Sequence, residues 1–214
     1  MTKIRTGIFG GSFNPIHNGH IALGKAFLEQ AQLDELWFVV SPQNPLKVNA
    51  DLLDDQLRLE MTRLALEDSS GSSGSNGSSG SSFDGLRNRG SRLCASDIEF
   101  HLPRPSYMIN TLEAISSQYP DREPVLLIGG DNWERFHQWY RHEDIIRRYQ
   151  IYVYPREEAN VAPKGGYSEG VIISAPLLPI SSTDIRQRIR QGLSIHNLVP
   201  PSVEEYIHTK QLYK

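Results

Sequence analysis

The chain has 214 residues, which is long enough for one α/β domain with a sizeable core. Its formal net charge is −3 and it has no run of Lys or Arg, so its charge does not suggest nucleic-acid binding. No apolar run approaches the ~20 residues that a membrane helix needs, and we expect no signal peptide, because the sequence starts directly with a predicted strand. The single cysteine, Cys94, excludes a disulfide framework within the chain and favours a cytoplasmic protein. From the apolar runs, we expect no membrane partner.

Apolar and amphipathic segments alternate along the chain. Strands are predicted at 4–9, 35–40, 93–100, 124–128, 151–154 and 171–174. Helices are predicted at 18–31, 54–66, 107–118, 183–191 and 202–209, with an interrupted helical segment at 132–148. This alternation is typical of a doubly wound, mostly parallel α/β sheet, and we expect one domain over residues 1–214. Ligands gather at the carboxyl ends of such strands, so the loops after Phe9, Val40 and Ile128 should line one cleft.

Residues 69–82 consist of Ser, Gly and one Asn. Such a segment cannot bury apolar surface, so the sequence predicts a flexible insertion without a catalytic role. The composition does not decide whether the insertion is natural or engineered. It is not expected to be a domain boundary, because the motifs on either side of it should meet at one site.

The run GGSFNPIHNGH, from Gly10 to His20, connects the first predicted strand to the first predicted helix. Gly10 and Gly11 are expected to let the backbone turn tightly and approach a ligand closely. His17 and His20 are expected in the first helical turn, where side chains three residues apart share one face. The amides and the positive dipole end of the helix face the same space. The run therefore predicts a polyphosphate pocket with two imidazole donors.

Other readings of this run are less favoured. The dinucleotide fingerprint G-x-G-x-x-G is absent, and no Gly-Lys-Ser/Thr of a P-loop follows. His17 and His20 could form a zinc pair, but no third ligand stands at a suitable spacing. We therefore predict no protein metal site.

A second run, ISSTDIR, ends at Arg186 and begins another predicted helix. Ser181 or Ser182 is a natural helix cap. By itself the run is no more than a capped helix start. Beside the first motif, the hydroxyls of Ser182 and Thr183 and the forked cation of Arg186 predict a second group of phosphate contacts.

Both runs resemble motifs of the nucleotidylyltransferase superfamily. The first is similar to G-x-F-x-P-x-H-x-G-H, and the second to I-S-S-T-x-I-R. The resemblance implies a Rossmann-like fold and transfer of a nucleoside monophosphate from a triphosphate to a phosphate acceptor. It implies catalytic roles for His17, His20 and Arg186. The ATP-binding residues that it implies are Gly10, Gly11, Ser12, Phe13, His17, His20, Gly129, Asp131, Ser181, Ser182, Thr183 and Arg186.

Three further segments resemble the bacterial nicotinate mononucleotide adenylyltransferases. They are LDELWFVV followed by SPQNPLK, then PSYMINTL, then IGGD followed by QWY. The chain departs from that family at Leu46, where His is usual, and at Met108, where Thr is usual. The resemblance covers essentially the whole chain except the Ser/Gly run.

The same resemblance implies an acceptor site. Its residues are Asn14, Lys47, Met108, Trp139 and Tyr140. A pyridinium ring stacks well on an indole, and Trp139 is the expected platform, with Trp133 as the alternative. Backbone amides near Met108 and Tyr140 are expected to hold the acceptor carboxylate.

The implied reaction joins ATP, with Mg²⁺, to nicotinate mononucleotide and gives deamido-NAD and pyrophosphate. Two alternatives remain from the sequence. One is an adenylyltransferase with pantetheine phosphate as acceptor, and the other is a nucleotide-binding module without turnover. The sequence leaves the oligomeric state open between monomer and homodimer.

Overall fold

The computed structural model describes residues 2–42, 52–69, 92–155, 170–175 and 178–214. Within these ranges six parallel strands form one sheet in the order β3-β2-β1-β4-β5-β6. The strands are β1 (Ile4–Gly11), β2 (Glu35–Val40), β3 (Leu93–Ser96), β4 (Arg122–Gly129), β5 (Gln150–Tyr154) and β6 (Gly170–Ile172). The doubly wound parallel fold is therefore confirmed. The strand order reverses between β1 and β4, which is where such sheets bind ligands.

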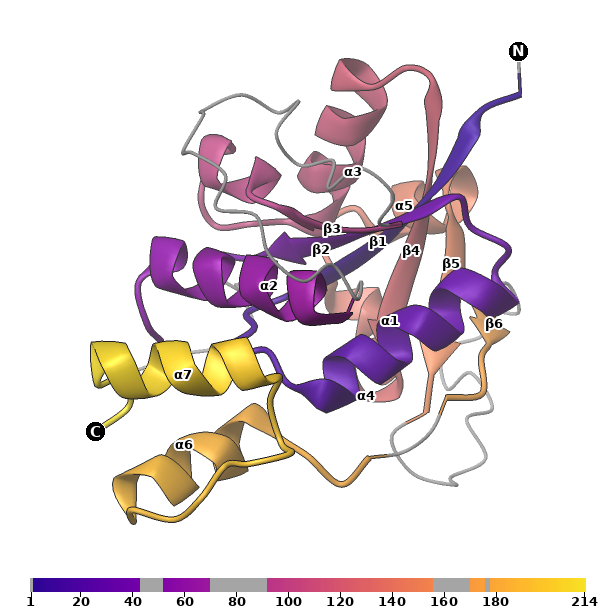
Figure 1. Ribbon diagram of the computed structural model, residues 1–214. Helices are drawn as coiled ribbons and strands as arrows, with labels where there is room; N and C mark the ends of the chain where they lie inside the picture. Colours follow the sequence, from indigo (N-terminus) through magenta and orange to yellow (C-terminus); the bar gives the residue numbers. More distant parts are fainter. Residues whose placement is uncertain (1, 43–51, 70–91, 156–169, 176–177) are drawn as a thin grey trace.

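Helices cover both faces of the sheet (Figure 1). One face carries α1 (Asn18–Gln30), α2 (Asp55–Ser69) and α7 (Pro201–Lys210), and the other carries α3 (Met108–Gln118) and α5 (His142–Arg148). The short helix α4 (Gly130–Glu134) follows β4 directly, and α6 (Ser182–Arg190) lies beyond the carboxyl ends of the strands. Successive side chains of β1 point to opposite faces of the sheet, so Ile8 packs in the hydrophobic cluster on one face and Phe9 in the cluster on the other.

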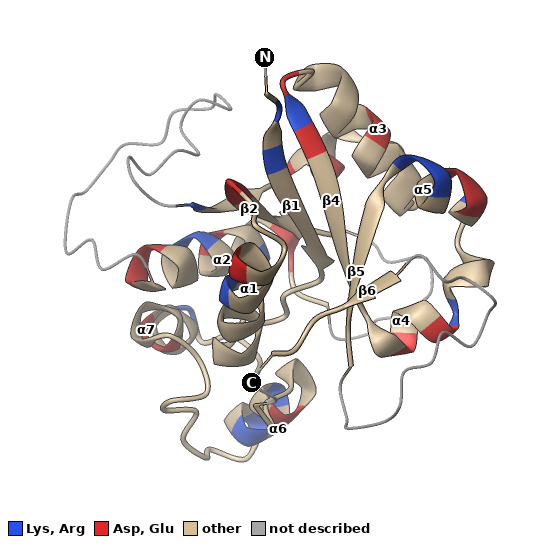
Figure 2. Ribbon diagram, turned by 90° about the vertical axis from the view of Figure 1, so that its right-hand side faces the viewer, with Lys and Arg blue, Asp and Glu red and all other residues tan. Residues whose placement is uncertain are grey.

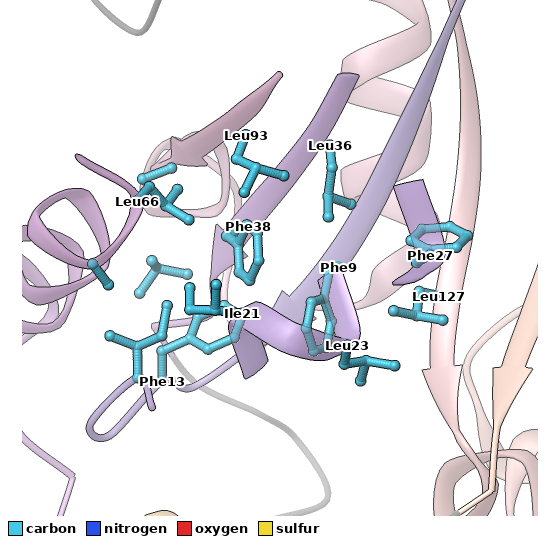
Figure 3. Packing of buried hydrophobic residues seen from close by; sticks show 14 of the residues in the cluster. Phe9, Phe13, Ile21, Leu23, Phe27, Leu36, Phe38, Leu66, Leu93 and Leu127 are labelled. Carbon is cyan, nitrogen blue, oxygen red and sulfur yellow. The ribbon is translucent and has the colours of Figure 1, made fainter. Parts of the chain in front are cut away.

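Aromatic rings fill the core between the sheet and α1 (Figure 3). The Phe9 ring lies 5.6 Å from Phe13 and 5.3 Å from Phe38, measured between ring centroids. Phe13 belongs to the loop that follows β1, so this packing holds the loop against the sheet. The loop that the sequence singled out is thus part of the core and has a defined position.

The prediction of a strand over 93–100 is wrong in its second half. The strand ends at Ser96, and a 3-10 helix, η2 (Ile98–His101), follows it. Apolar residues at 98 and 100 fit either structure, because a short apolar run has no decisive period. The change of structure brings Glu99 to the carboxyl ends of the strands, where it lines the cavity described below.

The Ser/Gly run falls mostly outside the described residues. Ser69 is the last residue of α2, and residues 70–82 are not described. No helix in the described part of the chain is long and apolar enough to cross a membrane. Cys94 is buried, as a small core residue would be.

Candidate active site

A cavity of about 1080 Å³ opens at the carboxyl ends of β1 and β4. The expected site residues that line it are Gly10, Gly11, Ser12, Phe13, Asn14, His17, His20, Met108, Gly129, Trp139, Tyr140, Ser181, Ser182, Thr183 and Arg186. Ser41, which follows β2, lines it as well, so the loops after β1, β2 and β4 meet as expected. The charged residues of β1 and β4 stand at the opposite, amino ends of these strands (Figure 2).

The loop after β1 turns later than the sequence suggested. Gly10 and Gly11 continue the strand, in register with Val39 and Val40 of β2. The left-handed backbone is found at Phe13, with φ of 43°. A Cβ at Gly10 would lie 2.8 Å from the methyl carbon of Met108, the flexible end of that side chain. The prediction of a tight turn at the two glycines is therefore wrong, because both end the strand and the left-handed residue follows at Phe13.

The two histidines stack on each other at the start of α1. Their ring centroids are 3.6 Å apart, with 26° between the ring planes. His17 is the N-cap residue, with extended backbone, and lies just before the first helical turn in which it was expected. Its backbone N–H donates to His20 Nδ1 at 3.3 Å. A neutral imidazole whose Nδ1 accepts carries its proton on Nε2, so His20 can donate that proton toward a ligand.

The second motif contacts the first. Ser181 is the N-cap of α6, and its Oγ accepts from the Asp184 amide at 3.1 Å. The Ser182 hydroxyl donates to Pro15 O at 2.9 Å, and Arg186 Nη1 donates to Asn14 O at 2.8 Å. These bonds span 167 and 172 residues of sequence. The two phosphate motifs predicted from opposite ends of the chain are therefore joined directly.

The Arg186 guanidinium has donors that are not fully used by the described part of the protein. Its Nη2 lies 3.4 Å from Thr183 Oγ1, while its Nε is buried without a hydrogen-bond partner among the described residues. A buried donor without a partner costs free energy, so such a group is a candidate for binding an anion. The carboxylate of Asp184 is held by the Ser181 hydroxyl at 2.6 Å, on the cap of the same helix.

The other side of the cavity is formed by the start of α3. Tyr107 is the N-cap residue, and the first backbone bond of this helix is donated by Asn110 to Tyr107 O at 2.9 Å. The amides of Met108 and Ile109 precede that bond, at the end of the helix that favours anions. The Tyr107 and Tyr140 rings lie 4.8 Å apart and both line the cavity.

Of the two tryptophans considered as the stacking platform, only Trp139 lines the cavity. Trp139 is half-buried, lines the cavity and packs on Phe136 with ring centroids 5.4 Å apart. Trp133 is 4% exposed in the core cluster of α3 and α5 and is not among the cavity residues. Trp139 is therefore the indole that a ligand in the cavity could reach.

Two expected site residues are not placed in the cavity. Asp131 is exposed in the first turn of α4, and its neighbours Gly129 and Asn132 line the cavity while it does not. Lys47 lies outside the described residues. Asn14 is only 5% exposed, and its side chain accepts hydrogen bonds from the protein, as described below.

Glu99 is a cavity residue that the sequence analysis missed. It is 2% exposed, and the Thr111 hydroxyl donates to its Oε1 at 2.8 Å. Burial raises the pKa of the Glu99 carboxyl, and the hydroxyls of Thr111, Ser41 and Ser106 oppose that rise. The sequence carried no signal for Glu99. It lay within the segment predicted as a strand, where a glutamate suggested no function.

Arg58 is a second residue that was missed. Its side chain is fully buried and donates to Ser12 O at 2.6 Å, to Ser41 O at 2.8 Å and to Leu53 O at 2.9 Å. It also pairs with Asp55. Burial lowers the pKa of the Arg58 guanidinium, and the Asp55 carboxylate opposes this. Arg58 therefore ties two loops of the cavity to α2, and its place on an apolar helix face was the available signal.

No protein metal centre is evident in the described ranges, where no three His, Cys, Asp or Glu side chains gather as ligands. Among the described residues that line the cavity, the donors are imidazoles, hydroxyls, amides and the Arg186 guanidinium, and the carboxyl groups are those of Glu99 and Asp184. Such donors suit phosphate oxygens. A parallel sheet with phosphate-compatible donors at its switch point is typical of α/β proteins that bind nucleoside phosphates.

Comparison with known proteins agrees with this class. Residues 8–188 match the family described as cytidylyltransferase-like. A probable nicotinate-nucleotide adenylyltransferase of Bacteroides thetaiotaomicron is 42% identical over 96% of this chain and 91% of its own length. A protein of the same description from Flavobacterium johnsoniae is 41% identical over 99% of this chain and its full length. The chain therefore belongs to the cytidylyltransferase-like family, in its branch of nicotinate-nucleotide adenylyltransferases.

Solved structures share the fold. The nicotinic acid mononucleotide adenylyltransferase of Plasmodium falciparum, solved in complex with NaAD, aligns with a TM-score of 0.72 over 98% of this chain and 97% of its own. The sequence identity is 18%. A second structure of that protein, in complex with APC, aligns with a TM-score of 0.70.

Proposed function

We propose that the protein transfers AMP from ATP to nicotinate mononucleotide, giving deamido-NAD and pyrophosphate. One observation carries the proposal beyond family membership. Ser182 and Arg186 donate to the backbone of Pro15 and Asn14, in the loop that leads into the helix start with His17 and His20. The donors of the two motifs thus lie in contact along one cavity, as a bound triphosphate would require.

In the proposed complex, the α-phosphate of ATP lies near His20, with His17 stacked behind it. The β- and γ-phosphates lie toward the start of α6, near Ser182, Thr183 and Arg186. ATP enters with Mg²⁺, which its own phosphate oxygens and water hold, as suits that ion. This assignment gives Mg²⁺ no protein ligand.

The chemical step is a displacement at the α-phosphorus. A phosphate oxygen of the mononucleotide forms the new bond, and the bond from the α-phosphorus to the bridging oxygen breaks, so pyrophosphate leaves with the electron pair. The attacking phosphate has a second pKa near 6 and is mostly a dianion at neutral pH, so no protein base is required. The protein contributes positioning and donors aimed at the charge that develops.

The acceptor would lie between the start of α3 and the segment that follows η3 (Phe136–Gln138). Its pyridinium ring would stack on Trp139, and its carboxylate would accept from backbone amides at Met108 and Tyr140. Backbone donors make the identity of the Met108 side chain unimportant for this contact. Asn14 and Lys47 are the further residues proposed for the acceptor side.

The test is product formation by the purified protein with ATP and Mg²⁺. Four reactions are compared, with nicotinate mononucleotide, with nicotinamide mononucleotide, with pantetheine phosphate and without acceptor. We expect pyrophosphate release to depend on nicotinate mononucleotide. The amide should react far more slowly, because two donors meet a carboxylate well but oppose an NH₂ group.

Three outcomes would contradict parts of the proposal. Turnover with pantetheine phosphate alone would assign another acceptor. ATP binding without product from any acceptor would indicate a module without turnover. Equal use of the acid and the amide would contradict the proposed backbone-amide pocket but would be consistent with the proposed reaction.

A further inference from the structure

The chain after α7 returns to the nucleotide-binding loop. Gln211 follows the helix in a left-handed conformation, with φ of 54°, and the Leu212 amide donates to Ile207 O at 3.0 Å. Tyr213 is also left-handed, with φ of 65°. This reversal directs the Tyr213 side chain inward, where it is 7% exposed within the core cluster.

The Tyr213 hydroxyl donates to Asn14 Oδ1 at 2.9 Å. A weaker second donor to the same oxygen is the Leu53 amide, at 3.4 Å. Burial raises the pKa of the Tyr213 hydroxyl, with Arg186 and Arg58 opposing the rise, so the hydroxyl keeps its proton and remains a donor at neutral pH. Tyr213 and Asn14 are 199 residues apart in sequence.

Asn14 is the centre of the contacts that join the two phosphate motifs. Its carbonyl accepts from Arg186, and the next carbonyl, of Pro15, accepts from Ser182. The residue before it, Phe13, has a left-handed backbone, which a residue with a side chain keeps only where its surroundings hold it. The position of Arg186 thus depends on how firmly Asn14 is held.

We propose that Tyr213 is a positioning residue of the ATP site: its hydroxyl fixes the Asn14 side chain, and thereby the carbonyl on which Arg186 is aligned. The inference rests on the proposed function for the identity of the ligand, ATP. Tyr213 itself is absent from the lining of the cavity, so its effect on substrate is transmitted through Asn14. A shift of about 1 Å in a positioning contact can cost about 10²-fold in rate, so one remote hydroxyl can matter.

The test compares Tyr213→Phe with Tyr206→Phe. Both remove one hydroxyl from a tyrosine of the same C-terminal region, and Tyr206 lies on α7, half-buried against the same core. In the described part of the chain, the Tyr206 hydroxyl has no hydrogen bond to the loop between β1 and α1 that contains Asn14. We measure KM for both substrates, kcat, the Kd of ATP with Mg²⁺, and the Tm of each variant.

In Tyr213→Phe, we expect the Kd and KM for ATP to rise about three- to ten-fold, the range for one lost buried hydrogen bond. KM for nicotinate mononucleotide should also rise, because Asn14 is a proposed acceptor residue as well, so the deciding constant is the Kd of ATP measured without acceptor. Tyr206→Phe should leave all three constants unchanged. Equal constants in the two variants, or a fall in Tm without a change in the Kd of ATP, would overturn the inference.

A double variant separates a direct effect from one that passes through Asn14. In an Asn14→Ala background the partner oxygen is gone, so Tyr213→Phe should no longer change the Kd of ATP. The same rise in both backgrounds would show that Tyr213 acts by another route. Because ATP binding is measured without acceptor, this result does not depend on which phosphate acceptor the enzyme uses.

Discussion

The donor that the structure offers at the proposed α-phosphate position is the Nε2–H of His20. Its proton is fixed there because Nδ1 accepts from the His17 backbone. Stacking on His17 fixes the ring plane as well. A donor that is held before the substrate arrives needs no reorganisation when charge develops.

His20→Ala should therefore lower kcat by about 10²- to 10³-fold, the usual loss for one such donor. KM for the acceptor should change little, because the lost contact is with the reacting phosphate. The matched control is His208→Ala, an exposed histidine on α7 that lies outside the cavity lining. Steady-state kinetics and Tm measure both variants, and wild-type turnover in His20→Ala would remove the residue from the reaction.

Glu99 predicts a dependence of stability on pH. Burial raises the pKa of its carboxyl above the ordinary value of 4.5, so the folded protein binds this proton more tightly than the unfolded chain does. The stability that this proton contributes is complete below pH 4.5 and is lost as the pH rises through the folded pKa.

Glu99→Gln should remove that loss, since the amide stays neutral and still accepts from Thr111 through its oxygen. The free energy of unfolding of the variant, relative to wild type, should rise as the pH increases from about 4.5 toward 8. Urea unfolding of both proteins across this range measures the difference. If the difference in unfolding free energy between the two proteins does not vary with pH, burial does not raise the pKa of this carboxyl.

Among the secondary-structure elements, α2 supports the cavity through Arg58. A single guanidinium holds carbonyls of the loops after β1 and β2 and of the segment before α2, and it is paired with Asp55. Asp55 in turn pairs with Arg104 at 2.8 Å, on the segment before α3. The position of the loops thus depends on one buried cation as well as on apolar packing.

Arg58→Met should lower the free energy of unfolding by about 3–5 kcal/mol, because it leaves buried acceptors without their donor and Asp55 without its buried partner. Arg63→Met on the same helix is the control. Its pair with Glu60 is long, at 3.9 Å, and about half-exposed, so its loss should cost at most about 1 kcal/mol. Chemical denaturation measures both, and equal losses would contradict a special role for Arg58.

At the scale of the whole molecule, the cavity draws its two sides from the two faces of the sheet. The loop before α1, on one face, and α6, beyond the strand ends, supply the proposed phosphate contacts. The start of α3 and the segment after η3, on the other face, supply the proposed contacts to the pyridine ring and carboxylate of the acceptor, and Asn14 of the loop before α1 is proposed for the acceptor as well. The two substrates would then meet at the carboxyl ends of β1 and β4, which are neighbours in the sheet.

This division predicts that two substitutions will raise the KM values of different substrates. Arg186→Ala should raise KM for ATP by about ten-fold or more, as expected for loss of a charged contact, with a smaller effect on KM for nicotinate mononucleotide. Trp139→Ala should raise KM for the acceptor and leave that for ATP nearly unchanged. The control Arg188→Ala, on the same helix as Arg186 and outside the cavity, should change neither. Parallel shifts of both KM values in either variant would contradict the division.

The sequence by itself determined the features that depend on neighbours along the chain. The three-residue spacing of His17 and His20, a cap at Ser181 or Ser182 and the alternation of strands and helices are local. The structure brings the two imidazoles together, shows that Ser181 is the cap and confirms the doubly wound sheet. The family follows from the same local motifs. Local patterns succeed here because hydrogen bonds within a turn or helix join residues at most a few positions apart.

Only the tertiary structure decided the roles of Glu99, Arg58 and Tyr213. Each is a single residue without periodicity, and its partners lie 12, 46 and 199 residues away for Thr111, Ser12 and Asn14 respectively. Whether a charged or polar side chain is solvated or buried with partners depends on long-range packing, which a linear pattern does not encode. The same reason explains the strand end at Ser96, because either structure suits the apolar residues beyond it until the sheet brings Glu99 to the cavity.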